Sequence, residues 1–92
     1  NQDWAKMMRD AQSSVLKMKQ DMEKMQSELD QIMIEGTSGG GAVRIICNGN
    51  QIYKQVKISK DAVDPNDVET LEDLVLAALK DASTKAQTLM QT

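Results

Sequence analysis

The sequence predicts an α/β fold of the α+β type: a long N-terminal helix, an antiparallel sheet and a C-terminal helix in one domain of 92 residues. Three observations predict it. Apolar residues in the first third recur at steps of four and three, two short β-prone runs flank an Asn-Gly pair, and apolar residues near the end follow a period of about 3.6. We expect the long helix over residues 1–31, the sheet over 32–59 and the C-terminal helix over 66–90.

The first helix carries one unbroken apolar seam of the coiled-coil type, formed by Trp4, Met8, Ala11, Val15, Met18, Met22, Met25, Leu29 and Ile32. Such a helix would be ~43 Å long at ~1.5 Å per residue. A compact domain of this size has a radius of gyration of only ~12 Å. One chain therefore cannot cover its own seam, and we expect a second copy to cover it, forming an intertwined homodimer.

The predicted dimer interface consists of Met8, Val15, Met18, Met22, Met25 and Leu29. The composition favours an oligomer too, because the chain has no Phe and only one Trp and one Tyr, which leaves a thin core for a single copy. Methionine-rich surfaces also adapt to varied partners. A docking surface for another protein is therefore the alternative interpretation of the same residues.

The middle of the chain predicts short strands separated by turns. The first β-prone residues are 32–34, and residues 37–41 contain three glycines that favour a turn. A strand over 42–47 and a return strand over 51–59 flank Asn48-Gly49, which predicts a tight hairpin turn because both residue types tolerate positive φ.

The two hairpin strands predict one apolar face and one mostly polar face. Val43, Ile45 and Cys47 alternate on the first strand, and Ile52, Val56 and Ile58 alternate with Tyr53, Gln55 and Lys57 on the second, with Lys54 interrupting the apolar row. Cys47 is expected to be a buried small apolar residue rather than a reactive thiol.

The C-terminal helix is expected to begin with Asn66 as its N-cap and Glu69 three residues later, a loose form of the capping box. Its apolar stripe is made of Leu71, Val75, Ala78, Ala82, Ala86 and Leu89, widened by Leu74 and Leu79. The alanines in that stripe allow a close approach to the sheet.

Several function classes are disfavoured by the residues that the chain lacks. It contains no His, which is the commonest general base and metal ligand, and no Ser, Cys or Lys has an evident activating partner. We therefore expect no enzymatic activity, no metal, no cofactor and no small-molecule substrate. No apolar run approaches the ~18 residues of a membrane span.

Charge is distributed unevenly along the chain. Residues 1–34 carry five cations against six acids, residues 35–60 carry four cations against Glu35 alone, and residues 61–92 carry two cations against seven acids. The middle segment is thus a basic island of net charge +3. Phosphate contact is one interpretation of the cations, and a solvated helix balanced by its own acids is the other for those of the first helix.

The order of the segments resembles the YbaB/EbfC family of nucleoid-associated proteins over residues 4–90. The resemblance rests on Lys17-Met18, on Glu23 to Gln26, on Gly36 with Gly39 to Gly41 and Val43, on Asn48-Gly49, on Val56 to Ile58, and on Leu71 to Val75 with Ala77, Ala78, Asp81 and Ala82. It implies a three-stranded antiparallel sheet, a tight homodimer with protruding helices, and duplex DNA binding with little sequence preference.

On this basis we expect a non-enzymatic protein that binds duplex DNA through phosphate contacts and helps to organise a nucleoid. The expected DNA-binding residues are Lys6, Arg9, Lys17, Lys19 and Lys24, followed by Arg44, Lys54 and Lys57. The alternative is a protein-interaction module that uses the methionine-rich helix and binds no DNA. The acidic pI of about 4.8 predicts weak and steeply salt-sensitive DNA binding.

The expected location is the cytoplasm and its nucleoid. The sequence opens on Asn rather than Met, so we expect an upstream segment. If that segment was a targeting peptide, the expected location becomes an organellar nucleoid.

Overall fold

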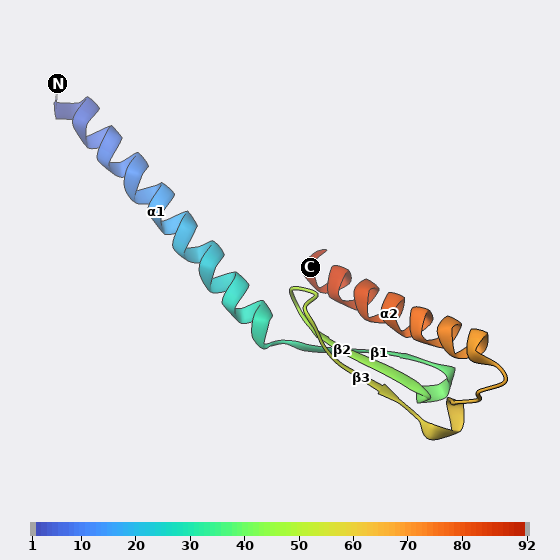
Figure 1. The fold of residues 1–92 in the computed structure, drawn as a ribbon. Coiled ribbons are helices and arrows are strands. Elements are labelled where there is room, and N and C mark those ends of the chain that lie inside the picture. Colours follow the sequence, from blue (N-terminus) through green and yellow to red (C-terminus); the bar gives the residue numbers. More distant parts are fainter. Residues whose placement is uncertain (1, 92) are drawn as a thin grey trace.

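A computed structural model gives the structure of the chain and describes residues 2–91. The helix α1 (Gln2–Gln31) is followed by strands β1 (Met33–Ser38), β2 (Val43–Asn48) and β3 (Tyr53–Ile58) and by the helix α2 (Val68–Gln91) (Figure 1). The strands form one antiparallel sheet in the order β1-β2-β3. This arrangement confirms the predicted long helix, three-stranded antiparallel sheet and C-terminal helix.

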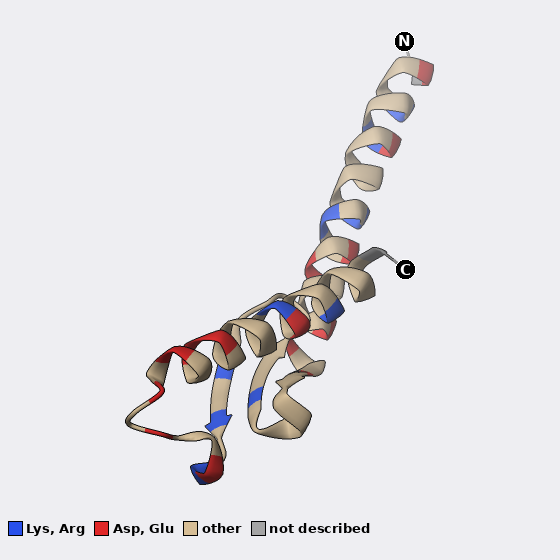
Figure 2. Ribbon diagram, turned by 90° about the vertical axis from the view of Figure 1, so that its right-hand side faces the viewer, with Lys and Arg blue, Asp and Glu red and all other residues tan. Residues whose placement is uncertain are grey.

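Helix α1 extends far from the body formed by the sheet and α2, as both views show (Figure 1, Figure 2). The chain measures 79 × 19 × 17 Å and has a radius of gyration of 21.6 Å. A compact domain of this length would have a radius of gyration near ~12 Å. The excess comes from α1, whose 30 residues lie almost entirely outside the body.

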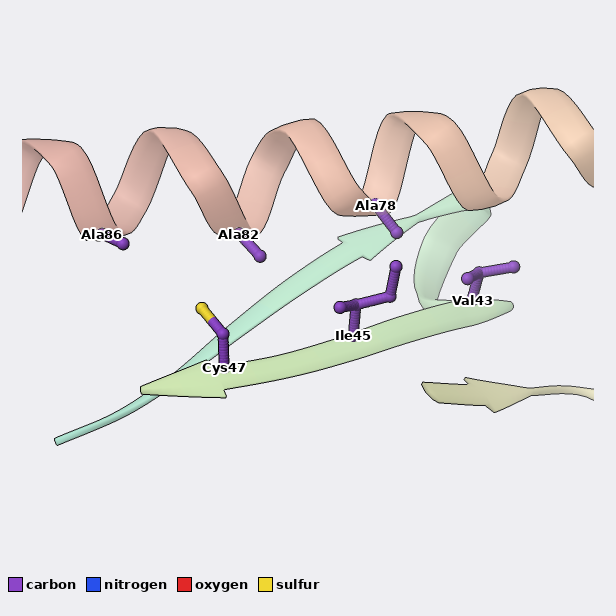
Figure 3. Packing of buried hydrophobic residues seen from close by; sticks show 6 residues of the cluster. All are labelled: Val43, Ile45, Cys47, Ala78, Ala82 and Ala86. Atoms are coloured by element: carbon purple, nitrogen blue, oxygen red, sulfur yellow. The ribbon is translucent and has the colours of Figure 1, made fainter. Parts of the chain in front are cut away.

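The core lies between α2 and the strands β1 and β2. Val43, Ile45 and Cys47 of β2 point toward α2 and are buried against Ala78, Ala82 and Ala86 (Figure 3). The predicted apolar stripe of α2 is therefore confirmed at its alanines, whose small side chains let the helix lie close to the sheet.

Strand β1 continues through Gly36 to Ser38, beyond the predicted residues 32–34 and into the segment predicted as a turn. A side chain at Gly36 would place its Cβ 2.6 Å from the Cβ of Ala82. The Thr37 backbone N–H donates to Asp81 Oδ2 at 2.9 Å, and Ser38 Oγ donates to the Leu74 carbonyl at 2.6 Å. These contacts with α2 hold residues 36–38 in an extended strand.

The hairpin turn after β2 forms at the predicted residues, but its positive φ lies elsewhere than Asn48-Gly49 suggests. The Gln51 N–H donates to the Asn48 carbonyl at 3.0 Å, and Gln51, rather than Asn48 or Gly49, adopts a positive φ of 60°. Gly49 is needed for another reason: its N–H donates to the Leu29 carbonyl at 2.9 Å, and a Cβ would lie 2.8 Å from that oxygen. Contact with the end of α1 thus overrides the local turn preference.

Strand β3 contains a bulge that the predicted alternation omitted. Ile46 pairs with Gln55, whereas Cys47 pairs with Tyr53, so Lys54 is the additional residue. Residues paired across strands share a face of the sheet. The expectation that Tyr53 lies on the polar face with Gln55 and Lys57 was therefore wrong, because the bulge shifts Tyr53 to the face of Cys47.

Helix α2 begins at Val68, and its N-cap is Asp67 rather than the predicted Asn66. Asp67 Oδ1 accepts from the Thr70 backbone N–H at 3.3 Å, and Asp67 Oδ2 accepts from Thr70 Oγ1 at 2.6 Å. The Asn66 N–H instead donates to Asp64 Oδ1 at 2.9 Å, within the turn before the helix. Asp67 is the better cap because its carboxylate also faces the positive end of the helix dipole.

Candidate functional site

The cations of α1 are all exposed on the projecting helix: Lys6, Arg9, Lys17, Lys19 and Lys24. Lys6, Lys17 and Lys24 share one side, because spacings of 11 and 7 residues return to nearly the same angle of a helix. This side lies away from the apolar seam. The structure therefore places three of the five predicted phosphate contacts of α1 in one row.

Each lysine of α1 has an acid four residues later, which is the spacing at which helical side chains meet. The four pairs are Lys6 with Asp10, Lys17 with Asp21, Lys19 with Glu23, and Lys24 with Glu28. Positive and negative residues therefore alternate along the helix (Figure 2). Arg9 is the one cation of α1 without such an acid, so α1 presents almost no unbalanced positive charge.

The sheet brings Arg44 and Lys57 together on the face opposite α2. Val43 and Ile45 point toward α2, so Arg44 between them points away. Arg44 pairs with Lys57 of β3, and the two side chains therefore share the open face. Lys54 lies at the bulge of the same strand. In Figure 2 the lysines and arginines of the strands appear as blue segments.

Arg44 is held partly by a carboxylate of the neighbouring strand. Its Nη1 lies 3.5 Å from Glu35 Oε1, and its Nε donates to the Gly41 carbonyl at 3.4 Å. The side chains of Arg44 and Glu35 remain 54% and 45% exposed. An ion pair this open is weak and leaves the guanidinium available to a second anion.

The two groups of cations are not brought together within one chain. Helix α1 meets the sheet at the hairpin tip after β2, whereas Arg44 and Lys57 lie toward the opposite end, where Val43 pairs with Ser38 and Ile58. One chain therefore offers two separate basic surfaces, one on α1 and one on the sheet.

The hairpin tip itself binds the last turns of α1, a role that sequence reasoning missed. Asn50 Nδ2 donates to Asp30 Oδ1 at 2.6 Å and to the Gln26 carbonyl at 3.1 Å. Asn48, only 1% exposed, donates from Nδ2 to Asp30 Oδ1 at 3.4 Å. We call Asp30, Asn48, Gly49 and Asn50 the tip clamp. The sequence signal that could have indicated this role is the presence of Asn48 and Asn50 on either side of Gly49.

Two apolar surfaces remain uncovered. Along α1, Trp4, Met8, Val15, Met18, Met22 and Met25 are 44–66% exposed, and Leu29 is half-buried. On the body, a groove between α2 and β3 is lined by Ile58, Leu71, Val75, Leu76 and Leu79, with Glu72 beside them. Apolar surface of this extent is unusual on a monomer and is typical of an interaction site.

The thiol of Cys47 and the acidic side chains of the described residues have structural rather than reactive or metal-binding roles. Cys47 is buried, and burial raises the pKa of its thiol, which disfavours the reactive thiolate. Among the described residues, no cluster of three or more His, Cys, Asp or Glu side chains could hold a metal ion. None of the helices within residues 2–91 is long and apolar enough to cross a bilayer.

Comparisons with known proteins agree on one family. Proteins named nucleoid-associated protein are similar to this chain in Dictyoglomus thermophilum (45% identity over 78 residues, 85% of this chain and 75% of the relative) and in Pelotomaculum thermopropionicum (43% over 86 residues, 94% and 78%). One from Chloroflexus aurantiacus is 47% identical over 74 residues, which are 80% of this chain and 74% of the relative.

A crystal structure of an uncharacterized protein from Helicobacter pylori has the same fold. Its TM-score is 0.70 at 19% identity, over 84% of this chain and 89% of that one. The model of the YbaB/EbfC DNA-binding family matches residues 1–92. This family is a DNA-binding, non-enzymatic one. The chain therefore belongs to the YbaB/EbfC DNA-binding family.

Proposed function

We propose that this protein is a homodimer that binds duplex DNA through its phosphates, with little sequence preference, and so helps to organise a nucleoid. Membership of the YbaB/EbfC DNA-binding family is the observation that carries the proposal. The relatives named nucleoid-associated protein support the location. As a single domain, residues 1–92 act as one unit of the dimer.

The dimer is supported by the shape of the chain. A seam of apolar side chains runs along a 30-residue helix that its own body does not cover. Two such seams, at Met8, Val15, Met18, Met22, Met25 and Leu29, would bury each other or dock on the partner's body. The groove between α2 and β3 supplies a second apolar surface for the same partner.

DNA binding is supported by exposed cations on two surfaces. Lysine and arginine side chains attract phosphates whatever the base sequence, and a dimer doubles their number. The candidates are Lys6, Arg9, Lys17, Lys19 and Lys24 on α1 and Arg44, Lys54 and Lys57 on the sheet. Any sequence preference would then come from DNA shape.

The test is a salt titration of binding to a fluorescent duplex of random sequence, together with the mass of the protein in solution. We expect a dimer whose affinity falls linearly on a log-log plot, with a slope of about −0.9 for each phosphate contacted. A monomer at micromolar concentration contradicts the dimer. A slope near zero, or no binding at about 50 mM salt, contradicts the phosphate contacts.

The second candidate function is a protein-interaction module. The observation that favours it is the exposure of methionines that lie off the seam, such as Met7 at 69% and Met33 at 61%. Flexible thioether side chains adapt to different partner surfaces. The salt titration separates the two candidates, because this module would bind no DNA.

A further inference from the structure

We infer that the open face of the sheet, around Arg44 and Lys57, is the principal phosphate-binding surface of this protein, ahead of the projecting helix. The inference rests on the proposed DNA binding and assigns its site. Duplex DNA is the committed ligand, recognised through the charge of its backbone.

The first argument is the balance of charge. Each lysine of α1 has a carboxylate one turn later, so a phosphate approaching that helix meets a positive and a negative charge together. The open face of the sheet holds Arg44 and Lys57 against the carboxylate of Glu35. The sheet face is therefore the surface with unbalanced positive charge.

The second argument is the pairing of Arg44 with Lys57. Residues directly opposite each other in a sheet have Cβ atoms about 4.5–5.5 Å apart, and like charges at such paired positions are destabilising. Glu35, at 3.5 Å from Arg44, offsets one of the two charges. A phosphate between Arg44 and Lys57 would neutralise both charges, so binding would relieve the unfavourable pairing that the register imposes.

The third argument is that this face is suited to a polar ligand. The helix-facing side of β2 is buried, and the uncovered apolar groove lies between α2 and β3. An apolar partner surface would therefore bind at the groove or the seam, because binding at the sheet face would bury unpaired cations, which is costly. The sheet face, with Arg44, Glu35, Thr37 and Lys57 exposed, stays available to DNA.

The experiment compares two double neutralisations that remove equal charge. Arg44→Gln with Lys57→Gln alters the sheet face, and Lys17→Gln with Lys24→Gln is the matched control on α1. Binding to the random duplex is measured from about 50 to 200 mM salt. We expect at least about tenfold weaker binding for the sheet variant, with a salt slope smaller by about 1 per lost contact, and a smaller loss of affinity, with a smaller change of slope, for the α1 variant.

A third variant, Glu35→Gln, removes the competing carboxylate and leaves both cations in place. It should bind DNA more tightly and with a steeper salt slope, a gain that loss of structure cannot produce. Solution mass and thermal unfolding confirm that each variant remains a folded dimer.

The inference is overturned if the α1 variant loses as much affinity as the sheet variant, or if Glu35→Gln leaves binding unchanged. Failure of the unaltered protein to bind the duplex would instead remove the proposed function, and the assigned site with it. The two failures are distinguishable because only the second appears before any substitution is made.

Discussion

At the scale of single residues, small side chains decide how closely α2 approaches the sheet. Gly36 lies under α2, where Ala78 and Ala82 leave room for a hydrogen atom but not for a methyl group. Ala82 and Ala86 are fully buried in the same contact. The approach is close because each of these residues contributes the smallest side chain that its element permits.

Gly36→Ala should destabilise the fold by about 1–3 kcal/mol, because the added Cβ must push α2 away from β1. Urea unfolding followed by circular dichroism measures the change. Gly40→Ala is the control: Gly40 has a φ of 69°, and a Cβ there meets nothing within 4 Å. That variant should cost only about 1 kcal/mol from backbone strain. Equal losses would contradict the close approach as the cause.

Asp81 is the residue whose protonation should make the stability of the fold depend on pH. The Thr37 N–H donates to Asp81 Oδ2 at 2.9 Å, and Lys85 Nζ lies 3.1 Å from the same oxygen. These two bonds hold the pKa of Asp81 below its ordinary value of 3.8. The carboxylate is the form they stabilise, so their contribution is present above that value and is lost as pH falls through the lowered pKa.

Asp81→Asn should therefore lower stability at neutral pH and flatten its fall below about pH 4. Urea midpoints at several pH values measure both effects. Asp61→Asn, which lies outside the contact between β1 and α2, is the control. Parallel pH curves for the Asp81 variant and the unaltered protein would contradict this role.

At the scale of elements, the tip clamp determines where α1 points. Helix ends leave carbonyl groups without partners inside the helix. At the end of α1 the Leu29 carbonyl accepts from the Gly49 N–H at 2.9 Å, and Asp30 binds Asn48 and Asn50. The hairpin thus serves as the cap of a helix that has little other contact with the body.

Asn50→Ala removes two hydrogen bonds between the hairpin and α1 and should speed amide exchange at Gly49 and in the last turn of the helix. The expected loss of global stability is about 1 kcal/mol. Hydrogen exchange read by NMR measures the local opening. Asn66→Ala, in the loop before α2, is the control. Unchanged exchange at Gly49 would show that the clamp does not hold the helix.

At the scale of the whole molecule, the chain has the extended shape expected of one subunit of the proposed dimer. A chain 79 Å long, with an apolar seam along a projecting 30-residue helix, cannot bury that seam by itself. Burial of a methionine side chain stabilises an interface by about 1.5–3 kcal/mol. Several methionines along one helix therefore amount to a substantial driving force for pairing.

Met18→Lys with Met22→Lys should weaken the dimer by at least about 3 kcal/mol, which is more than a hundredfold in the dissociation constant. Sedimentation at several concentrations measures the shift toward monomer. Leu16→Lys is the matched control, because Leu16 is 55% exposed and lies on the side of α1 opposite the seam. A similar shift for Leu16→Lys would contradict the predicted seam.

Some features of the candidate site depend on contacts that no local pattern reveals. Strand alternation predicts on which face of the sheet Arg44 lies. Its position opposite Lys57, however, depends on the register of β2 and β3. The bulge at Lys54 and the turn at Gln51 also escaped prediction. Both arise where the hairpin meets its neighbours, and there tertiary contacts outweigh the preference of Asn48-Gly49 for positive φ.

By itself the sequence determined the order of elements, the seam, the alanine stripe of α2 and the family. The reason is that the spacing of apolar residues and the size of each side chain follow directly from the order of the amino acids. The tertiary structure alone decided which cations stand together, which residues clamp α1, and how far β1 extends. The physical reason is that these features come from pairings between residues distant in the chain, where hydrogen bonds and close packing select one register among several that the sequence allows.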